Sequence, residues 1–316
     1  MDYNLVSGRN PIDHSFSKTS LSIAGIFLVI YLLWLNLVVG FRNDHLYFII
    51  FLAVTYFASA VTRKFVLGFV FFWLFWIIYD SMRVYPNFMV NTIHIIEPYN
   101  LEKFLFPITV GNEILTPNEY FYAHPNKLSD FLSGVFYLTW VPLPMMYCLY
   151  LFFTDKEMLL KFSATFLFAN FIGFAIYYLY PAAPPWYLAN HGSSINFDIP
   201  GNAAQLLRFD TIIDYPLFSN MYNKNANVFA AIPSLHAAYP VVLLYFGLKK
   251  RHKWLSILFA IDVIGIWYAA VYSMHHYIID VILGSFCAII AIFVFDYVLM
   301  KTKIRTFIEK YAAFIA

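Results

Sequence analysis

The chain has 316 residues, of which 61% are hydrophobic and only 12% are charged. So few charged residues cannot cover the surface of a water-soluble protein of this length, which excludes a soluble globular fold. The formal net charge of +2 is too small to indicate nucleic-acid binding, so we expect no nucleic-acid partner. Cys148 and Cys287 both lie in apolar runs, so neither a disulfide framework nor a cysteine metal site is expected.

Eight apolar runs approach the length of about 20 residues that a helix needs to cross the hydrocarbon core of a bilayer. Backbone groups in lipid cannot bond to water, so each run should be helical. We expect the first run to be a retained span, because the polar residues 1–20 lack the apolar core and cleavage site of a secretory signal. The sequence therefore predicts an all-α polytopic membrane protein with about eight transmembrane helices. The runs are residues 21–40, 46–61, 65–79, 131–153, 158–180, 228–248, 254–272 and 276–300.

The basic residues predict the orientation of these helices. If the N-terminus lies inside, the inner segments hold fourteen of the 20 Lys and Arg residues and the outer segments hold six. The positive-inside rule then places both termini in the cytoplasm. We expect residues 301–316 to form a short amphipathic helix on the cytoplasmic side.

Two long loops would then lie on the outer side. We call residues 81–130 the first loop and residues 181–227 the second loop, and both are too long to be simple connections. The first loop mixes apolar and polar residues between Ile93 and Phe106. This pattern suits a helix or hairpin in the membrane interface, or an apolar underside packed on the helix bundle.

Histidine and aspartate mark the outer starts of two apolar runs. His236 follows Pro-Ser-Leu at the start of the sixth run, and His276 and Asp280 lie at the start of the eighth. Residues four apart share a helix face, so Asp280 can accept a proton from one ring nitrogen of His276 and leave the other as a nucleophile. His236, from another helix end at the same membrane depth, could then act as general acid and base.

Other roles for these residues have to be weighed. A lone His or Asp at a helix end is more often a solvated cap or a helix-packing hydrogen bond. Two such clusters on one side of the membrane favour an active site. Two His and one Asp could also bind a metal ion, but the His–Asp pairing already explains the spacing, so we expect neither a metal nor another cofactor.

The order Pro-Ser-x-His and then His-x-x-x-Asp resembles the type 2 phosphatidic acid phosphatase superfamily. Within it, residues 181–187 (PAAPPWY), 232–236 (IPSLH) and 275–280 (HHYIID) are similar to the inositol phosphorylceramide synthases. The resemblance implies that His276 is the nucleophile of a phosphohistidine mechanism, Asp280 its orienting partner and His236 the acid and base.

The resemblance also implies a division of the chain. It covers about residues 65–300, which would form a catalytic membrane domain with a six-helix phosphatase-like core. Residues 1–64 would add N-terminal membrane spans, and residues 301–316 a cytoplasmic tail.

Departures from the superfamily pattern favour a synthase over a phosphatase. Tyr180-Pro181 stands in place of Arg-Pro, Gly173 replaces a Lys, and Ala269 and Ala270 replace a Ser-Arg pair. Basic phosphate contacts are thus missing at both of these motifs. A phosphodiester brings one negative charge and a phosphomonoester nearly two, so weaker cationic binding suits a diester donor.

We therefore expect a lipid phosphotransferase that moves phosphoinositol from phosphatidylinositol to ceramide, with its site on the extracytoplasmic side of the membrane. In a bacterial host this would be the outer face of the inner membrane. A lipid phosphatase of the same superfamily is the alternative within this chemistry. A lipid transporter or binding protein is the alternative from another class, which Asp262 near the middle of the seventh run and the pair Pro142 and Pro144 support only slightly. A carboxylate at this depth should be protonated or bonded to a neighbouring helix.

Further residues are expected to contact substrate. Arg83 at the outer end of the third run is the candidate phosphate contact, unless it pairs with Asp80. His275 would point about 100° from His276 on an ideal helix, so it should support the site. The polar residues of the second loop could read the inositol hydroxyls, although Asn and Asp often only form turns. The other expected contacts are Ser234, Trp186, Asp198, Asn202, Asp210, Asp214, Asn223 and Asn225.

Overall fold

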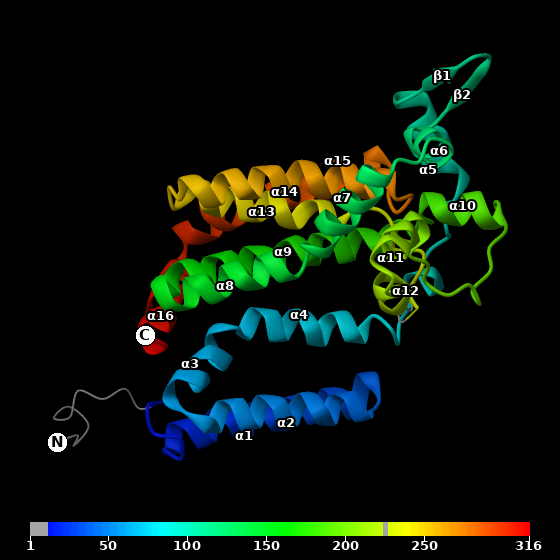
Figure 1. Ribbon diagram of the computed structural model, residues 1–316. Helices are drawn as coiled ribbons and strands as arrows, with labels where there is room; N and C mark the ends of the chain where they lie inside the picture. Colours follow the sequence, from blue (N-terminus) through cyan, green and yellow to red (C-terminus); the bar gives the residue numbers. More distant parts are fainter. Residues whose placement is uncertain (1–11, 224–226) are drawn as a thin grey trace, which may run out of the picture. The chain divides into compact units, whose positions relative to one another are not determined.

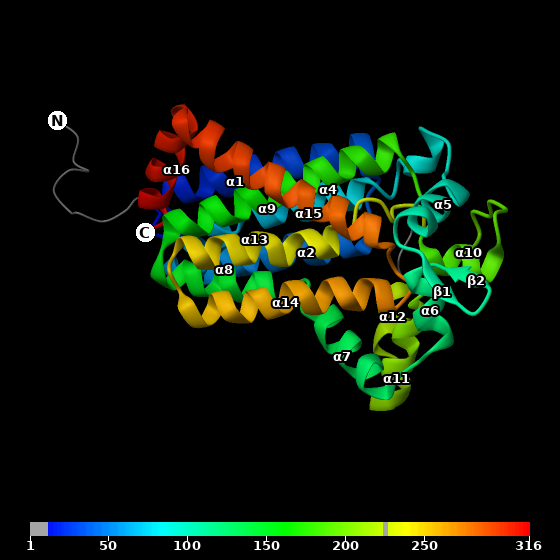
Figure 2. The same cartoon turned by 90° about the horizontal axis from the view of Figure 1, so that it is seen from above.

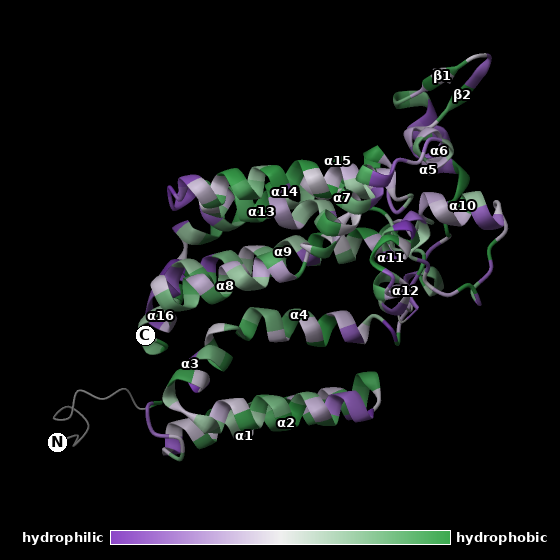
Figure 3. Ribbon diagram, in the orientation of Figure 1, coloured by the Kyte–Doolittle hydropathy of each residue, from purple (hydrophilic) through white to green (hydrophobic). Residues whose placement is uncertain are grey.

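The computed structural model describes residues 12–223 and 227–316, and these residues are helical along most of their length (Figure 1). They form two compact units. The first unit contains residues 12–84, 150–164 and 299–316, and the second contains residues 85–149 and 165–298. Apolar residues dominate the long helices of both units (Figure 3), as a lipid environment requires.

The first unit is built from the N-terminal helices and the C-terminal helix. The C-terminal helix forms where the amphipathic tail was expected, with Ile308 and Ala312 buried and Phe307 exposed. Its buried residues join Tyr56 and Leu160 in one apolar cluster. The helices are α1 (Lys18–Trp34), which continues as a π-helix (Leu35–Val39), α2 (Asn43–Ala58), α3 (Ala60–Gly68), α4 (Val70–Ser81) and α16 (Lys303–Phe314), together with the residues 150–164 that end α8 and begin α9.

The second unit contains both long loops and the remaining long helices. Helices α13, α14 and α15 pack against one another, and α7 packs on α14 (Figure 2). Small side chains such as Ala237, Ala269 and Ala270 are completely buried between these helices. The long helices of the unit are α7 (Lys127–Leu138), α8 (Pro142–Thr154), α9 (Lys156–Leu179), α13 (Leu235–Lys249), α14 (Lys253–Tyr272) and α15 (Ile278–Phe293).

Both long loops fold into short elements. The first loop forms both a helix and a hairpin, and its exposed apolar residues, among them Phe104 and Ile114, suit the predicted position in the membrane interface. Its elements are a 3₁₀ turn (Asn87–Met89), α5 (Ile96–Leu105), the antiparallel strands β1 (Ile108–Val110) and β2 (Glu113–Leu115), and α6 (Pro117–Ala123). The second loop contains α10 (Pro185–His191), a 3₁₀ turn (Ala204–Leu206), α11 (Leu207–Ile213) and α12 (Leu217–Tyr222).

The long helices identify an integral, multi-pass membrane protein. Within the described residues, four helical segments are long and apolar enough to cross a bilayer: Lys18–Val39, Lys156–Leu179, Lys253–Tyr272 and Ile278–Lys301. The last includes a π-helix (Val294–Val298) and a 3₁₀ turn (Leu299–Lys301) after α15.

Two bent helix pairs could add two more crossings. The pair α3 and α4 bends by 54°, and the pair α7 and α8 bends by 41°. The remaining expected spans are the shorter helices α2 and α13, of 16 and 15 residues. The helical membrane fold is therefore confirmed, while the number of eight crossings stays a prediction, as does the predicted division into domains.

Two expectations about single helices have clear outcomes. Asp262 in α14 accepts a hydrogen bond of 2.6 Å from the Thr139 hydroxyl at the end of α7, so the predicted bond to a neighbouring helix is confirmed. The sixth span was expected from residue 228, but α13 begins only at Leu235. The reason is local, because the Ser234 hydroxyl caps the helix by accepting a hydrogen bond of 3.3 Å from the Ala237 amide.

Candidate active site

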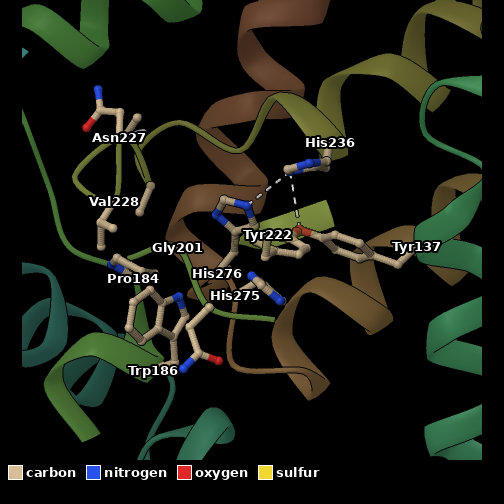
Figure 4. A pocket seen from close by; sticks show the side chains of 13 residues that line it. Tyr137, Pro184, Trp186, Gly201, Tyr222, Asn227, Val228, His236, His275 and His276 are labelled. Atoms are coloured by element: carbon tan, nitrogen blue, oxygen red, sulfur yellow. Dashed lines mark hydrogen bonds between the residues drawn. The ribbon is translucent and has the colours of Figure 1, made fainter. Parts of the chain in front are cut away.

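Two histidines meet where α13 and α15 begin. His236 lies in the first turn of α13, and its Nδ1 is 3.3 Å from Nε2 of His276, which precedes α15 (Figure 4). The backbone amide of Ser234 donates a hydrogen bond of 2.9 Å to the carbonyl oxygen of Asp280, which ties the two helix starts together. Gly284 permits this closeness, since a Cβ atom there would lie only 1.9 Å from the Ser234 carbonyl oxygen.

The expected pairing of His276 with Asp280 is present, but on a different backbone. We expected both residues on one helix face, and this was wrong because α15 begins only at Ile278. The fully buried Asp280 carboxylate instead turns back over the helix start. Its Oδ2 lies 3.4 Å from Nδ1 of His276 and accepts a hydrogen bond of 2.9 Å from the Tyr277 amide. At this distance and alignment the His–Asp contact is electrostatic, and such contacts often tighten when substrate binds.

The two neighbours of His276 lie at its two different ring nitrogens. Asp280 is at Nδ1 and His236 is at Nε2, so the three side chains form a line with the imidazole in the middle. A metal site needs donor atoms that converge on one point. The line instead resembles a nucleophile held between an orienting carboxylate and a proton-transfer group.

Aromatic side chains fix the His236 ring. The Tyr137 hydroxyl is 3.2 Å from Nδ1 of His236, and the Trp140 ring meets the imidazole edge-on at 4.7 Å between centroids. Sequence reasoning missed Tyr137 because it lies in an apolar run rich in aromatic residues. Its helix α7 is only 12 residues long and ends close to His236, a relation that depends on tertiary structure.

His275 supports the site, although not by the expected helix geometry. The backbone turns sharply at Met274, whose φ is +66°. His275 and His276 therefore lie in a non-helical segment between α14 and α15. Nε2 of His275 lies 2.9 Å from the carbonyl oxygen of Ala203. Its ring stacks on that of Tyr137 and contacts the tilted ring of Tyr222.

His275 and His276 are both neutral at neutral pH. Burial lowers the pKa of His276 to about 4. Burial and the neighbouring His276 lower the pKa of His275 to about 3. A neutral imidazole has a free lone pair, which a nucleophile requires.

His236, His275 and His276 line one pocket (Figure 4). Its wall combines imidazoles, aromatic rings and amides, and within the part of the chain that the structure describes it includes no Lys or Arg. Such a wall suits a ligand with many hydroxyl groups and a single negative charge. The lining residues are Tyr137, Pro184, Trp186, Gly201, Asn202, Tyr222, Asn227, Val228, Ala230, Ala231, His236, His275 and His276.

The expected substrate contacts divide into two groups. Trp186, Asn202 and His275 line the pocket, whereas the other described residues of the set do not. Arg83 belongs to the first unit, and its Nε lies 3.9 Å from Asp80, the pairing that we had weighed against a phosphate contact. Ser234 is the buried cap of α13. Substrate binding by Arg83 and Ser234 stays a prediction.

The polar residues of the second loop mostly form caps and turns. Both carboxylate oxygens of Asp210 accept hydrogen bonds from backbone amides at the start of α12, and Asp214 ends α11 with a φ of +52°. Asp198 and Asn223 are exposed, and Asn223 follows the last turn of α12. Their predicted contacts with substrate remain untested, and Asn225 lies outside the described residues.

Two buried residues of the first loop were missed by sequence reasoning. The Asn118 side chain donates hydrogen bonds of 2.8 and 2.9 Å to the carbonyl oxygens of Val271 and His276. Glu102 accepts hydrogen bonds from the amides of Ile278 and Ile279, at the start of α15. Both lie far from these partners in the sequence, so no local pattern points to them.

The chain was compared with known proteins. The family profile described as the PAP2 superfamily matches residues 110–294. The phosphoinositol dihydroceramide synthase of Bacteroides thetaiotaomicron is 44% identical over 293 residues, which cover 92% of this chain and 96% of that protein.

Fungal relatives are similar over shorter segments. The inositol phosphorylceramide synthase of Candida albicans is 28% identical over 56% of this chain and 39% of its own length. The inositol phosphorylceramide synthase catalytic subunit of Saccharomyces cerevisiae is 31% identical over 37% of this chain and 29% of its own length. No solved structure matches the chain.

Proposed function

Because the chain belongs to the PAP2 superfamily, and within it to the family of the Bacteroides synthase, we propose that it transfers phosphoinositol from phosphatidylinositol to a ceramide-type lipid. The observation that carries this proposal is the line of Asp280, His276 and His236 at the pocket. The similarity over nearly the whole length of a phosphoinositol transferase supports the choice of donor and acceptor.

The reaction would proceed in two half-reactions. His276 Nε2 attacks phosphorus, the bond from phosphorus to the diacylglycerol oxygen breaks, and His236 donates a proton to that oxygen. The product is a phosphohistidine that carries the inositol. His236 then takes the proton of the ceramide hydroxyl, whose oxygen attacks phosphorus while the phosphorus–nitrogen bond breaks. Asp280 holds the imidazole and stabilises its positive charge during both steps.

The wall of the pocket supports transfer from a diester. The described lining offers neutral donors, including Asn202 and the ring nitrogen of Trp186, where a phosphatase of the superfamily would use basic residues. Ala269 and Ala270, which stand where the superfamily pattern has a Ser-Arg pair, are fully buried between packed helices. A single negative charge with a polyol attached needs hydrogen bonds more than it needs a guanidinium group.

Labelled phosphatidylinositol tests the proposal directly. The purified protein in vesicles should produce labelled inositol phosphorylceramide and diacylglycerol only when ceramide is present. Release of water-soluble inositol phosphate at the same rate without ceramide would favour a hydrolase. Transport or binding without any turnover would favour a protein of another class. His276→Ala serves as the inactive control.

A second test concerns metal ions. A histidine nucleophile needs none, so the transfer rate should be unchanged after exhaustive chelation, and elemental analysis should find no stoichiometric zinc or manganese. Inactivation by a chelator that one metal reverses would contradict the proposed mechanism.

We also propose that both termini lie in the cytoplasm and that the site faces the opposite side of the membrane. The excess of Lys and Arg in the segments on the side of the termini supports this orientation. A cysteine placed at the exposed Asp198 should react with a membrane-impermeant reagent in intact cells. The same substitution at the exposed Lys303 should react only after the cells are opened.

A further inference from the structure

A buried carboxylate lies at the start of the helix that follows the nucleophile. Glu102 belongs to α5 in the first loop, and no part of it is exposed. Its two oxygens accept hydrogen bonds of 2.9 Å from the Ile278 amide and 3.2 Å from the Ile279 amide. Burying a carboxylate is costly unless such bonds compensate, so this arrangement requires an explanation.

The bonds satisfy groups that α15 cannot satisfy itself. The first amides of any helix lack a partner within the helix, and the partial positive charge of the helix start attracts an anion. Asp280 takes the Tyr277 amide, and Glu102 takes the next two. Two carboxylates thus share the three amides that directly follow His276.

The first loop also holds the backbone of the nucleophile itself. Asn118 donates a hydrogen bond of 2.9 Å to the carbonyl oxygen of His276, so two consecutive peptide units after the imidazole are held by loop side chains. We propose that ionised Glu102 is a positioning residue, which fixes the start of α15 and thereby sets the His276–Asp280 pair for attack on phosphorus. The reaction in this inference is that of the proposed function.

The charge of Glu102 has a second effect. The imidazole becomes positively charged when Nε2 bonds to phosphorus, and a second carboxylate beside Asp280 stabilises that charge. The pocket wall supplies no competing cation among its described residues. A neutral glutamine would keep one acceptor oxygen but lose the charge, so Glu102→Gln separates the electrostatic role from the packing role.

Titration of Glu102 should be visible in the pH dependence. Burial raises its pKa to about 7, although the two amide bonds oppose the shift and the nearby Asp280 adds to it. The other titratable group facing it is Tyr277, whose pKa burial and the carboxylates raise, so it stays neutral. Glu119 of α6 is bonded to Thr116 and Tyr99. Below pH 7 Glu102 gains a proton, so kcat should fall as the pH falls through about 7.

The test compares Glu102→Gln with Glu97→Gln, a variant in the same helix whose side chain is 63% exposed. Glu102→Gln should lower kcat by about 10- to 100-fold with an unchanged KM for the donor, because small misplacements of a nucleophile cost this much. The kcat of this variant should also no longer fall as the pH falls through about 7. Glu97→Gln should keep the wild-type rate and profile. Wild-type kcat and pH dependence in Glu102→Gln would overturn the inference.

A second readout does not depend on the lipid substrate. Diethyl pyrocarbonate modifies unprotonated histidine, and peptide mass mapping reports the rate at His276 alone. In the wild type this rate should fall as the pH falls through about 7, well above the pKa of His276 itself. A profile without this inflection overturns the inference even if Glu102→Gln fails to fold. If the inflection is present but phosphatidylinositol is not a donor, the proposed function fails and the positioning role stands.

Discussion

The two long loops differ in how they use their polar residues. In the first loop, Glu102 and Asn118 are almost completely buried, and their side chains bond the backbone at His276 and directly after it. In the second loop, Asp198, Asp214 and Asn223 are exposed, and Asp214 and Asn223 end helices. The second loop reaches the pocket instead through a few residues such as Trp186 and Asn202.

This difference distinguishes residues that hold the catalytic backbone from residues that contact the substrate. A buried polar side chain bonded to the backbone fixes the position of its partner, so its removal should change kcat. A side chain on a pocket wall can contact the ligand directly, so its removal should change KM. Composition alone does not distinguish these roles, because both loops contain similar numbers of polar residues between apolar ones.

Loss of the nucleophile should lower the transfer rate more than any substitution in the two loops. His276→Ala removes the atom that attacks phosphorus, so transfer and hydrolysis should both fall by about 10⁴-fold or more in an assay with labelled donor. The folded state of the variant is checked by size-exclusion chromatography in detergent. Turnover retained in folded His276→Ala would remove the basis of the comparison.

Asp280→Asn should have the next largest effect. The amide cannot hold the same ring tautomer or stabilise the imidazolium, so kcat should fall by about 10²- to 10⁴-fold. The bond from the Tyr277 amide can persist through the remaining side-chain oxygen, which should preserve the fold. A loss smaller than that of Asn118→Ala would mean that the loop contributes more than the carboxylate.

Asn118→Ala tests the supporting role of the first loop. Two bonds to buried carbonyl oxygens disappear, including the one to His276, so we expect kcat to fall about 10- to 100-fold with little change in KM. The matched control is Asn91→Ala, since the exposed Asn91 bonds the carbonyl oxygen of Tyr178. Equal effects in the two variants would show that the loop acts only through general stability.

Asn202→Ala tests recognition by the second loop and should have the smallest effect. Loss of one hydrogen bond to the headgroup should raise KM for phosphatidylinositol about 2- to 10-fold, and a donor without inositol should be less affected. Asp214→Ala, outside the pocket lining, should leave KM unchanged. The opposite result, with Asp214 sensitive and Asn202 indifferent, would place headgroup recognition outside the pocket lining.

The sequence predicted the parts of the fold that depend on local chemistry. Long apolar runs gave the helices, because hydrocarbon leaves the backbone no alternative. The motifs around His236 and His276 led to side chains that the structure brings within 3.3 Å. The start of α15 was placed too early, although Asp280 in the first helical turn is a known preference that could have corrected it.

What the sequence could not predict depends on long-range contacts. Glu102 meets a partner 176 residues away, and Asn118 meets one 158 residues away. Nothing local distinguishes Glu102 from the exposed Glu97 in the same helix. Similarly, Asp210 and Asn202 are both polar residues of the second loop in the sequence. Only the folded chain shows that Asp210 bonds the start of α12 and that Asn202 lies on the pocket wall.

The absence of a side chain at Gly284 determines how close the two histidines can lie. One hydrogen atom at this position fills the clearance between α15 and the Ser234 carbonyl oxygen, where a Cβ atom would lie at 1.9 Å. Any side chain would therefore act as a wedge between α15, which directly follows the nucleophile, and α13, which carries the proton donor. Gly284→Ala would remove no reacting group and would still move the two histidines apart, so this position outside the pocket lining limits which substitutions the reaction tolerates.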